Sequence, residues 1–213
     1  MDLPKDIKSG RLFVLSAPSG SGKSTLKDLA LQRLPELVYS VSYTTRRPRP
    51  GEIDGRDYNF ISEERFQAMV DGRDFLEWAG LFGRHYGTGR AWVLERLRQG
   101  RDVLADLDVT GAASVRRLMP GATLIFMAPP TVGELRRRLS SRRTESAEEA
   151  GRRLTQAREE IARRRIYDYL LINDRLDDSL EQLVAIIKFG RGRPMAEMEN
   201  FWPAFFADQD QPR

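Results

Sequence analysis

The chain has 213 residues and a formal net charge of +4, and it contains no cysteine and a single histidine, His85. These counts exclude a disulfide framework, a cysteine-ligated zinc or iron–sulfur site and any site built on two imidazoles. The longest apolar runs, at 124–128 and 183–187, are far shorter than the ~20 residues that span a bilayer, and the amino terminus lacks a signal-peptide pattern. We therefore expect a cytoplasmic protein without a membrane partner.

A phosphate-binding pattern follows the first predicted strand. An apolar run at 11–16 predicts that strand, and residues 23–34 have apolar side chains at helical spacing. The segment between them fits G-x-x-x-x-G-K-[ST], except that Ala17 replaces the first glycine. In this context Lys23 reaches the β and γ phosphates of a nucleotide, and Ser24 takes one Mg²⁺ position. The predicted nucleotide-binding loop comprises Ala17, Pro18, Ser19, Gly20, Ser21, Gly22, Lys23, Ser24 and Thr25.

The segment that follows interrupts the alternation of strands and helices. Its patterns predict short strands at 38–43, 59–61, 75–78 and 84–86, a capped helix from Ser62 to about residue 70, and an amphipathic helix at 90–99. A donor-rich loop lies at 44–55. We interpret residues 44–88 as a small β-rich insert.

The loop of this insert has the composition of an anion-binding site. Arg46 and Arg49 are three residues apart with a proline between them, so they can present two guanidinium groups to one anion. Tyr58 adds a hydroxyl group, and Glu52 can hold one of the guanidinium groups in place. This pattern favours a site for a phosphate monoester.

The second half of the chain returns to regular alternation. It predicts strands at 102–107, 123–127 and 169–172, and helices at 111–118, 132–139, 147–166 and 176–189. With the first strand, these elements predict an α/β fold with a parallel core sheet covered by helices. We place this core at residues 1–43 and 89–190. The tail at 191–213 has apolar residues at roughly helical spacing and is expected to dock on the domain or on a second copy, so a monomer and a homo-oligomer are both compatible with the sequence.

The basic charge is concentrated in one helical segment, at about 131–165. This segment contains eleven arginines and six glutamates, a net charge of +5, whereas the other 178 residues carry 24 basic and 25 acidic groups. A codon bias towards arginine does not explain such a local excess. A guanidinium group can donate two parallel hydrogen bonds to a phosphate group. We therefore interpret the segment as an arginine-rich lid over a polyphosphate.

A series of motifs runs through the chain. It begins with Thr44-Thr-Arg-Arg-Pro-Arg-Pro-Gly-Glu52 and Gly55-Arg-Asp-Tyr-Asn-Phe60. It continues in order with Phe75–Ala79, Tyr86-Gly-Thr88, Asp106-Leu-Asp108, Phe126–Pro130, Arg142-Arg-Thr144, Arg152-Arg-Leu154 and Asn173-Asp174. This ordered series resembles that of the guanylate kinases, a family of P-loop nucleoside monophosphate kinases, and the resemblance extends from about residue 10 to about residue 190.

The resemblance implies an activity: direct in-line transfer of the γ-phosphoryl group of ATP to GMP or dGMP with Mg²⁺. It implies that Ser42 and Glu77 bind guanine, because a carboxylate can accept from both N1–H and the exocyclic amine of this base. The implied GMP site comprises Ser42, Arg46, Arg49, Glu52, Tyr58, Glu77, Tyr86, Gly87, Thr88, Asp106 and Asp108.

The resemblance also implies the roles of the charged residues around the transferred group. Lys23, Arg46, Arg142 and Arg153 carry most of the transition-state charge, with Arg138 as a further contributor at the ATP site. Asn173 lies beside the adenine, and Ser24 and Asp106 hold Mg²⁺, partly through water. The sequence departs from the family pattern at Arg84, His85 and Arg143. We interpret His85 as a substituted loop residue and not as a general base.

Three alternative functions have less support in the sequence. A kinase of the same fold for another phosphorylated small molecule has no use for Ser42 and Glu77 as readers of guanine. A catalytically inactive interaction module is expected to lose phosphate-loop residues, and these are present. A nucleic-acid partner is suggested by the net +5 segment, but that segment lacks interleaved aromatic residues and contains six glutamates. We therefore expect no nucleic-acid partner.

Overall fold

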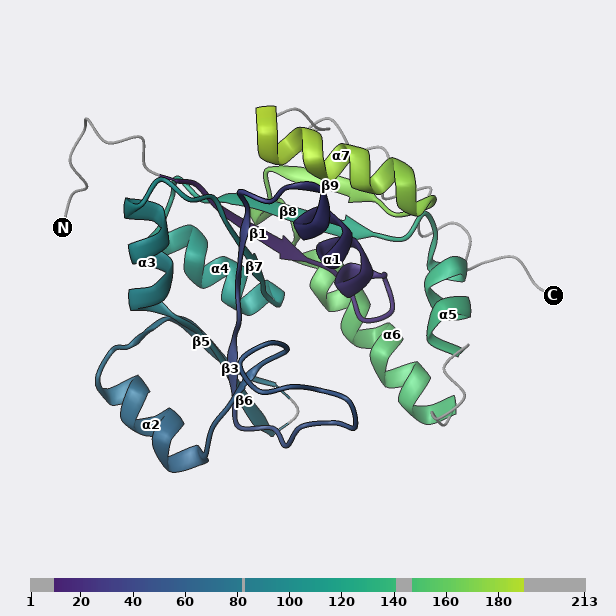
Figure 1. Cartoon of the computed structure of the whole chain (residues 1–213). Coiled ribbons are helices and arrows are strands. Elements are labelled where there is room, and N and C mark those ends of the chain that lie inside the picture. Colours follow the sequence, from purple (N-terminus) through teal and green to yellow (C-terminus); the bar gives the residue numbers. More distant parts are fainter. Residues whose placement is uncertain (1–9, 82, 141–146, 190–213) are drawn as a thin grey trace. The chain divides into compact units, whose positions relative to one another are not determined.

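The computed structural model describes residues 10–81, 83–140 and 147–189. The chain forms two compact units, one with residues up to 14 and 35–123, the other with residues 15–34 and those from 124 onward. Figure 1 labels the helices and strands. Five strands form the core sheet in the order β2-β7-β1-β8-β9, and four form a second sheet in the order β4-β3-β6-β5. Strand β1 (Leu12–Ser16) is fully buried and contributes residues to both units.

The first unit contains two parallel strands of the core sheet. Strands β2 (Val38–Ser40) and β7 (Val103–Asp106) are parallel, with Val38 opposite Val103. Helices α3 (Arg90–Arg98) and α4 (Val109–Leu118) flank this part and bury Val93, Leu97, Ala112 and Val115. Apolar residues at helical spacing therefore supply the buried face of both helices.

The second sheet belongs entirely to the first unit. It consists of β3 (Tyr43–Thr44), β4 (Asn59–Phe60), β5 (Phe75–Leu81) and β6 (Arg84–Gly89), with β5 antiparallel to β6. Helix α2 (Glu63–Asp71) is capped as the sequence predicts, because the side chain of Ser62 accepts a hydrogen bond from the backbone N–H of Arg65. The buried Phe66 of α2 stacks on Phe75 with 4.5 Å between ring centroids.

The prediction of one strand at residues 38–43 is wrong. The chain leaves the core sheet after Ser40 and enters the second sheet at Tyr43. Between them, the carbonyl of Val41 accepts from the side-chain amide of Asn59 at 3.0 Å, and the carbonyl of Ser42 accepts from the backbone N–H of Asn59 at 2.9 Å. Long-range pairing with Asn59 replaces the core-sheet ladder here, and local strand propensity carries no signal of that change.

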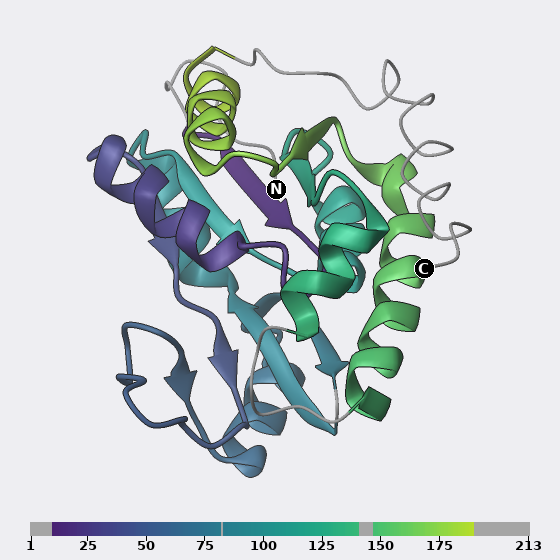
Figure 2. The ribbon, with the colours of Figure 1, turned by 90° about the vertical axis from the view of Figure 1, so that its right-hand side faces the viewer.

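The second unit also contains two parallel strands of the core sheet. Strands β8 (Thr123–Ala128) and β9 (Tyr169–Ile172) are parallel. Helices α1 (Lys23–Arg33) and α7 (Leu176–Phe189) lie side by side, as Figures 1 and 2 show, and Arg33 pairs with Glu181 at 3.4 Å. Helix α5 (Val132–Ser140) packs on α6 (Ala147–Ala162) through a buried cluster of Leu135, Leu139 and Ala157.

The helix predicted at 147–166 is shorter in the structure. Helix α6 ends at Ala162, and a 3-10 turn, η1, occupies Arg164–Ile166. Asp168 then exchanges two hydrogen bonds of 2.8 Å with Leu124, one through its backbone N–H and one through its carboxylate. This attachment to β8 ends the helical run early. The predicted α/β fold with a parallel core sheet is confirmed.

Within the described residues, no helix is long and apolar enough to cross a membrane.

Candidate functional site

The phosphate-loop pattern forms the connection from β1 to α1. Gly22 is the N-cap of α1 and has a φ of 87°, a left-handed conformation that favours glycine. A glycine has no side chain with which to cap the helix, and the first turn of α1 carries no acidic residue. The first backbone N–H groups of a helix have no intrahelical partner and attract anions. The start of α1 is therefore suited to bind phosphate.

The polar residues of this motif occupy the first turn of α1. Lys23 is the first residue of the helix, and Ser24 and Thr25 follow it on the exposed side. Ser19 is also exposed, whereas Pro18 and Ser21 are buried. The exposed hydroxyl of Ser24 is an oxygen donor of the kind that Mg²⁺ binds.

Asn173 contacts the phosphate loop inside the second unit. It follows β9, and its side-chain Nδ2 donates a 2.7 Å hydrogen bond to the carbonyl of Ser21. Arg138 of α5 donates from Nη2 to the backbone carbonyl of Asn173 at 3.0 Å. Arg138 is also held by Glu134, whose pKa is lowered to about 2 by hydrogen bonds from Arg137 and then from Arg138. The structure thus joins Arg138, Asn173 and the loop, three predicted parts of the ATP site.

The guanidinium group of Arg46 has a defined position in the first unit. Glu52 accepts from both terminal nitrogens of Arg46, at 2.8 and 2.9 Å. The same carboxylate accepts from the backbone N–H of Arg49 at 2.6 Å. The sequence expectation that Glu52 holds a guanidinium group is confirmed. The side chain of Arg49 is exposed.

Aromatic rings flank this arginine. The guanidinium carbon of Arg46 lies 5.2 Å from the ring centroid of Tyr58, and Tyr58 meets Tyr86 edge to face at 6.0 Å. The hydrogen bond that Arg46 donates to Glu52 raises the pKa of Arg46, and the nearby Tyr86 adds a smaller contribution. The same pair lowers the pKa of Glu52. A preorganised cation beside two tyrosine rings is suited to a phosphate monoester.

Glu77 is a buried carboxylate in strand β5. It is 7% exposed, and Oε1 accepts a 2.6 Å hydrogen bond from the hydroxyl of Thr88, the residue opposite it in β6. Burial raises the pKa of Glu77 to about 7; the Thr88 hydrogen bond opposes this shift, and the charge of Asp108 adds to it. A buried carboxylate with acceptor capacity left over suits a ligand that offers donors.

The start of α4 shapes the surroundings of Glu77. Asp108 is the N-cap of this helix, and its Oδ1 accepts from the backbone N–H of Gly111 at 2.7 Å. A Cβ atom on Gly111 would lie 2.5 Å from Oε2 of Glu77. The carboxylate of Glu77 can therefore occupy this place only because residue 111 has no side chain.

The alternation of strand β6 separates two faces. Tyr86 and Thr88 share the face that includes Glu77, whereas His85 lies on the opposite face. The ring of His85 stacks on Phe66 at 5.3 Å, and its Nδ1 pairs with Glu63. The strand predicted at 84–86 is confirmed, with His85 opposite Gly80 in the second sheet, so the interpretation of His85 as a loop residue is wrong.

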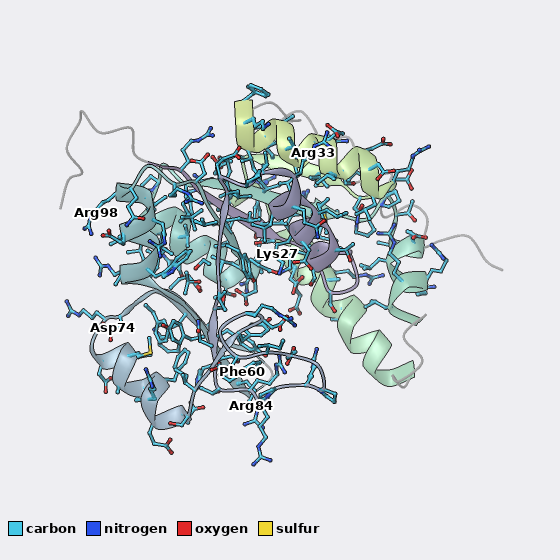
Figure 3. All side chains as sticks on the ribbon, viewed as in Figure 1. Lys27, Arg33, Phe60, Asp74, Arg84 and Arg98 are labelled. Atoms are coloured by element: carbon cyan, nitrogen blue, oxygen red, sulfur yellow. The ribbon has the colours of Figure 1, made fainter. Side chains whose placement is uncertain are left out.

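The remaining predicted residues of the first unit lie close to these groups in the fold. Ser42 is 7% exposed and directly precedes β3. Gly87 lies in β6, opposite Tyr43 of β3. Asp106 ends β7, two residues before Asp108. Arg84, a departure from the family pattern, is exposed and points away from the insert (Figure 3).

Some predicted residues lie outside the described part. Arg142, Arg143 and the tail at 191–213 are outside the described residues, and Arg153 belongs to helix α6 but its side chain is not described. Among the described residues, no group of three or more His, Cys, Asp or Glu side chains is arranged to hold a metal ion.

Two residues of the site were not identified from the sequence. A helix is predicted to start at Gly111, but this glycine has no part in the predicted site; its position three residues after Asp108, a residue type that often caps helices, was the available signal. Ser179 is fully buried in α7, and its hydroxyl lies 2.9 Å from Oδ1 of Asn173. Ser179 occupies a position of α7 at which the helical spacing of apolar residues predicts an apolar side chain. This exception in the pattern could have identified it.

Comparisons with known proteins agree with the motif series. The family model described as guanylate kinase matches residues 9–189. The chain is 48% identical to the guanylate kinase of Nocardia farcinica over 84% of this chain and 94% of that protein. It is 45% identical to the guanylate kinase of Coxiella burnetii over 87% of this chain and 90% of that protein.

A solved structure is also similar. The crystal structure of guanylate kinase from Anaplasma phagocytophilum matches with a TM-score of 0.72 and 31% identity, over 85% of this chain and 86% of that one.

Proposed function

This chain belongs to the guanylate kinase family, which phosphorylates GMP using ATP, and we propose that it transfers the γ-phosphoryl group of ATP to GMP and dGMP by direct in-line transfer assisted by Mg²⁺. The observation that carries the acceptor assignment is the buried carboxylate of Glu77. Its two oxygens can accept from N1–H and the exocyclic amine of guanine. Adenine lacks this pair of donors, so a site built this way rejects it by roughly 10⁴ in kcat/KM.

The first unit supplies the acceptor site in this proposal, with residues 44–88 as its GMP-binding insert. The monophosphate binds to Arg46, which Glu52 holds in place, to Arg49, and to the hydroxyls of Tyr58 and Tyr86. Ser42, Gly87, Thr88 and Asp108 complete the site. The hydrogen bonds of Arg46 to Glu52, at 2.8 and 2.9 Å, support this assignment because they hold the cation in position before the substrate arrives.

The second unit supplies the donor site. The triphosphate of ATP binds to the backbone N–H groups of the loop at residues 17–25 and to Lys23, at the start of α1, where the N-cap residue is a glycine. Residues 131–165 form the lid, from which Arg138, Arg142 and Arg153 neutralise the transferred group. Such reactions depend mainly on positioning and charge neutralisation, so the protein needs no general base of high reactivity.

The proposal includes Mg²⁺ as cofactor. The hydroxyl of Ser24 and the carboxylate of Asp106 are the oxygen donors assigned to it, and Mg²⁺ is typically held by one or two such groups together with substrate phosphates and waters. When bound, the ion supplies charge neutralisation on the phosphate oxygens. The chain's own arginines and Lys23 orient the phosphates. Because ATP and GMP are cytoplasmic metabolites, this function belongs in the cytoplasm.

A coupled assay with a panel of acceptors tests the proposed function. The purified protein is given ATP, Mg²⁺ and GMP, dGMP, AMP or a ribose phosphate, and ADP formation is followed. We expect GMP to be the best acceptor and dGMP to be used, with AMP at least ~10³-fold poorer in kcat/KM. A Lys23→Met variant serves as the control for contaminating kinases and should be inactive. A better acceptor without guanine would overturn the assignment of Glu77.

A further inference from the structure

We propose that Asn173 is a positioning residue of the phosphate loop: its side-chain amide holds the Ser21–Gly22 peptide so that the loop keeps the shape that binds triphosphate. This inference rests on the proposed use of the loop for ATP. Nδ2 of Asn173 donates to the carbonyl of Ser21 at 2.7 Å, across 152 residues of sequence, and Asn173 is 5% exposed.

The backbone geometry of the loop requires such a contact. A loop that turns its N–H groups towards a phosphate turns carbonyl groups the other way. Ser21 is fully buried, and a buried carbonyl without a donor is costly. Gly22 makes the approach of the amide possible, because a Cβ atom there would lie 2.8 Å from Nδ2 of Asn173.

Asn173 is itself held by the protein at every polar group. Its backbone N–H donates to Ala128 at 2.7 Å, and its carbonyl accepts from Arg138 at 3.0 Å. The hydroxyl of Ser179, buried in α7, lies 2.9 Å from Oδ1, and the backbone carbonyls of Arg175 and Ile172 are further acceptors for its proton at 3.0 and 3.3 Å. The carboxamide is thus engaged with protein at both ends. This arrangement indicates that Asn173 holds the loop in place. The family resemblance implies a different role, a position beside the adenine base.

The two roles differ in what they predict for ligands without adenine. If Asn173 holds the loop, its loss weakens binding of any triphosphate, including inorganic tripolyphosphate. If Asn173 contacts adenine, tripolyphosphate binding is unchanged and only ATP is affected. Competition by tripolyphosphate against ATP therefore separates the two.

The main variant is Asn173→Asp, which keeps the size of the side chain and places an oxygen where Nδ2 donates. Asn59→Asp is the matched control, because Asn59 makes the same kind of bond, from Nδ2 to the carbonyl of Val41 at 3.0 Å, in the first unit. We expect Asn173→Asp to weaken ATP and tripolyphosphate by about 10- to 100-fold, with the KM for GMP changed less than about threefold. In Asn59→Asp, ATP and tripolyphosphate binding should stay within about threefold of the parent.

Other outcomes overturn the inference. Weaker binding of ATP with unchanged binding of tripolyphosphate would show that Asn173 contacts the adenine. Equal losses of affinity for GMP and for ATP would show only a general loss of structure. If Asn173→Asp does not fold, Ser179→Ala takes its place. It should weaken the binding of ATP and tripolyphosphate by about three- to tenfold and leave the KM for GMP nearly unchanged. An unchanged affinity for tripolyphosphate in that variant would also reject the proposal.

The same measurements keep this inference separate from the proposed function. Titration calorimetry with tripolyphosphate and with ADP needs no turnover. A parent protein that binds both ligands but does not phosphorylate GMP would contradict the proposed function, and the comparison of variants would still decide the role of Asn173.

Discussion

Thr88 donates a 2.6 Å hydrogen bond from its hydroxyl to Oε1 of Glu77, and neither side chain is accessible beyond a few per cent of its surface. The bond engages one carboxylate oxygen and leaves acceptor capacity on both. Burial nevertheless dominates, so the pKa of Glu77 rises to about 7. The group proposed to read guanine is therefore poised between its two protonation states near neutral pH.

We predict a pH-dependent use of GMP. Only the ionised form of Glu77 can accept two hydrogen bonds from guanine, so kcat/KM for GMP should fall about tenfold per pH unit below about 7 and level off above it. Measurements from pH 5.5 to 8.5 at saturating ATP test this. Glu77→Gln should be much less active and should lose this dependence. A parent profile that is flat across pH 7 would contradict the raised pKa.

The same group should affect folding stability. Because the folded-state pKa is about 7 and the reference value is 4.5, the folded protein binds more protons than the unfolded chain between these values. The contribution of Glu77 is complete below about pH 4.5 and is lost as the pH rises through 7, a total of about 3 kcal/mol. The free energy of unfolding, measured with urea, should therefore become larger in Glu77→Gln relative to the parent as the pH rises. A constant difference from pH 5 to 8 would disprove it.

A methyl group at position 111 should disturb the same carboxylate. In Gly111→Ala the new Cβ meets Oε2 of Glu77 at 2.5 Å, so the carboxylate must move. We expect the KM for GMP to rise about tenfold while the KM for ATP is unchanged, and the melting temperature should hold because alanine favours a helix. Gly121→Ala is the control, since nothing lies within 4 Å of its Cβ position. Equal kinetics for both variants would remove Gly111 from the site.

Loss of the partner of Arg46 should weaken GMP binding more than it destabilises the fold. Glu52→Gln replaces the carboxylate that accepts hydrogen bonds from both terminal nitrogens of Arg46 with a neutral amide. The KM for GMP should increase about tenfold, because the guanidinium group is no longer preoriented. The exposed pair of Arg33 and Glu181 offers the control: Glu181→Gln should leave the kinetics and the stability almost unchanged. If both variants behave alike, the carboxylate of Glu52 has no positioning role.

His85 should prove dispensable for turnover. It stacks on Phe66 and faces away from Glu77 and Thr88. His85→Asn should therefore keep kcat within about twofold of the parent while lowering the free energy of unfolding by about 1 kcal/mol, because the stacked ring is lost. Steady-state assays and urea unfolding measure the two effects. A loss of more than about 100-fold in kcat would instead indicate a role in proton transfer.

The local features of this molecule were predictable from the sequence. The strand–loop–helix around Lys23, the alternation of strands and helices, the cap at Ser62 and the hold of Glu52 on a guanidinium group depend on residues close in sequence. Such features follow from periodicity, caps and short spacings. The roles assigned to Ser42, Glu77 and the lid arginines came from the family resemblance and stay predictions.

The remaining features depend on contacts between distant residues, and only the tertiary structure decides them. The strand predicted at 38–43 divides because Asn59 binds its middle. Asn173 meets Ser21 across 152 residues, and the buried hydroxyl of Ser179 lies beside it. The amino-acid sequence shows a carboxylate at position 77, but its pKa depends on burial and on Asp108, which the folded chain brings near it. The sequence by itself therefore determined the chemistry available to this protein, its phosphate loop, arginines and carboxylates. Folding decided which groups meet and how strongly each is held, because burial and long-range hydrogen bonds exist only in the packed chain.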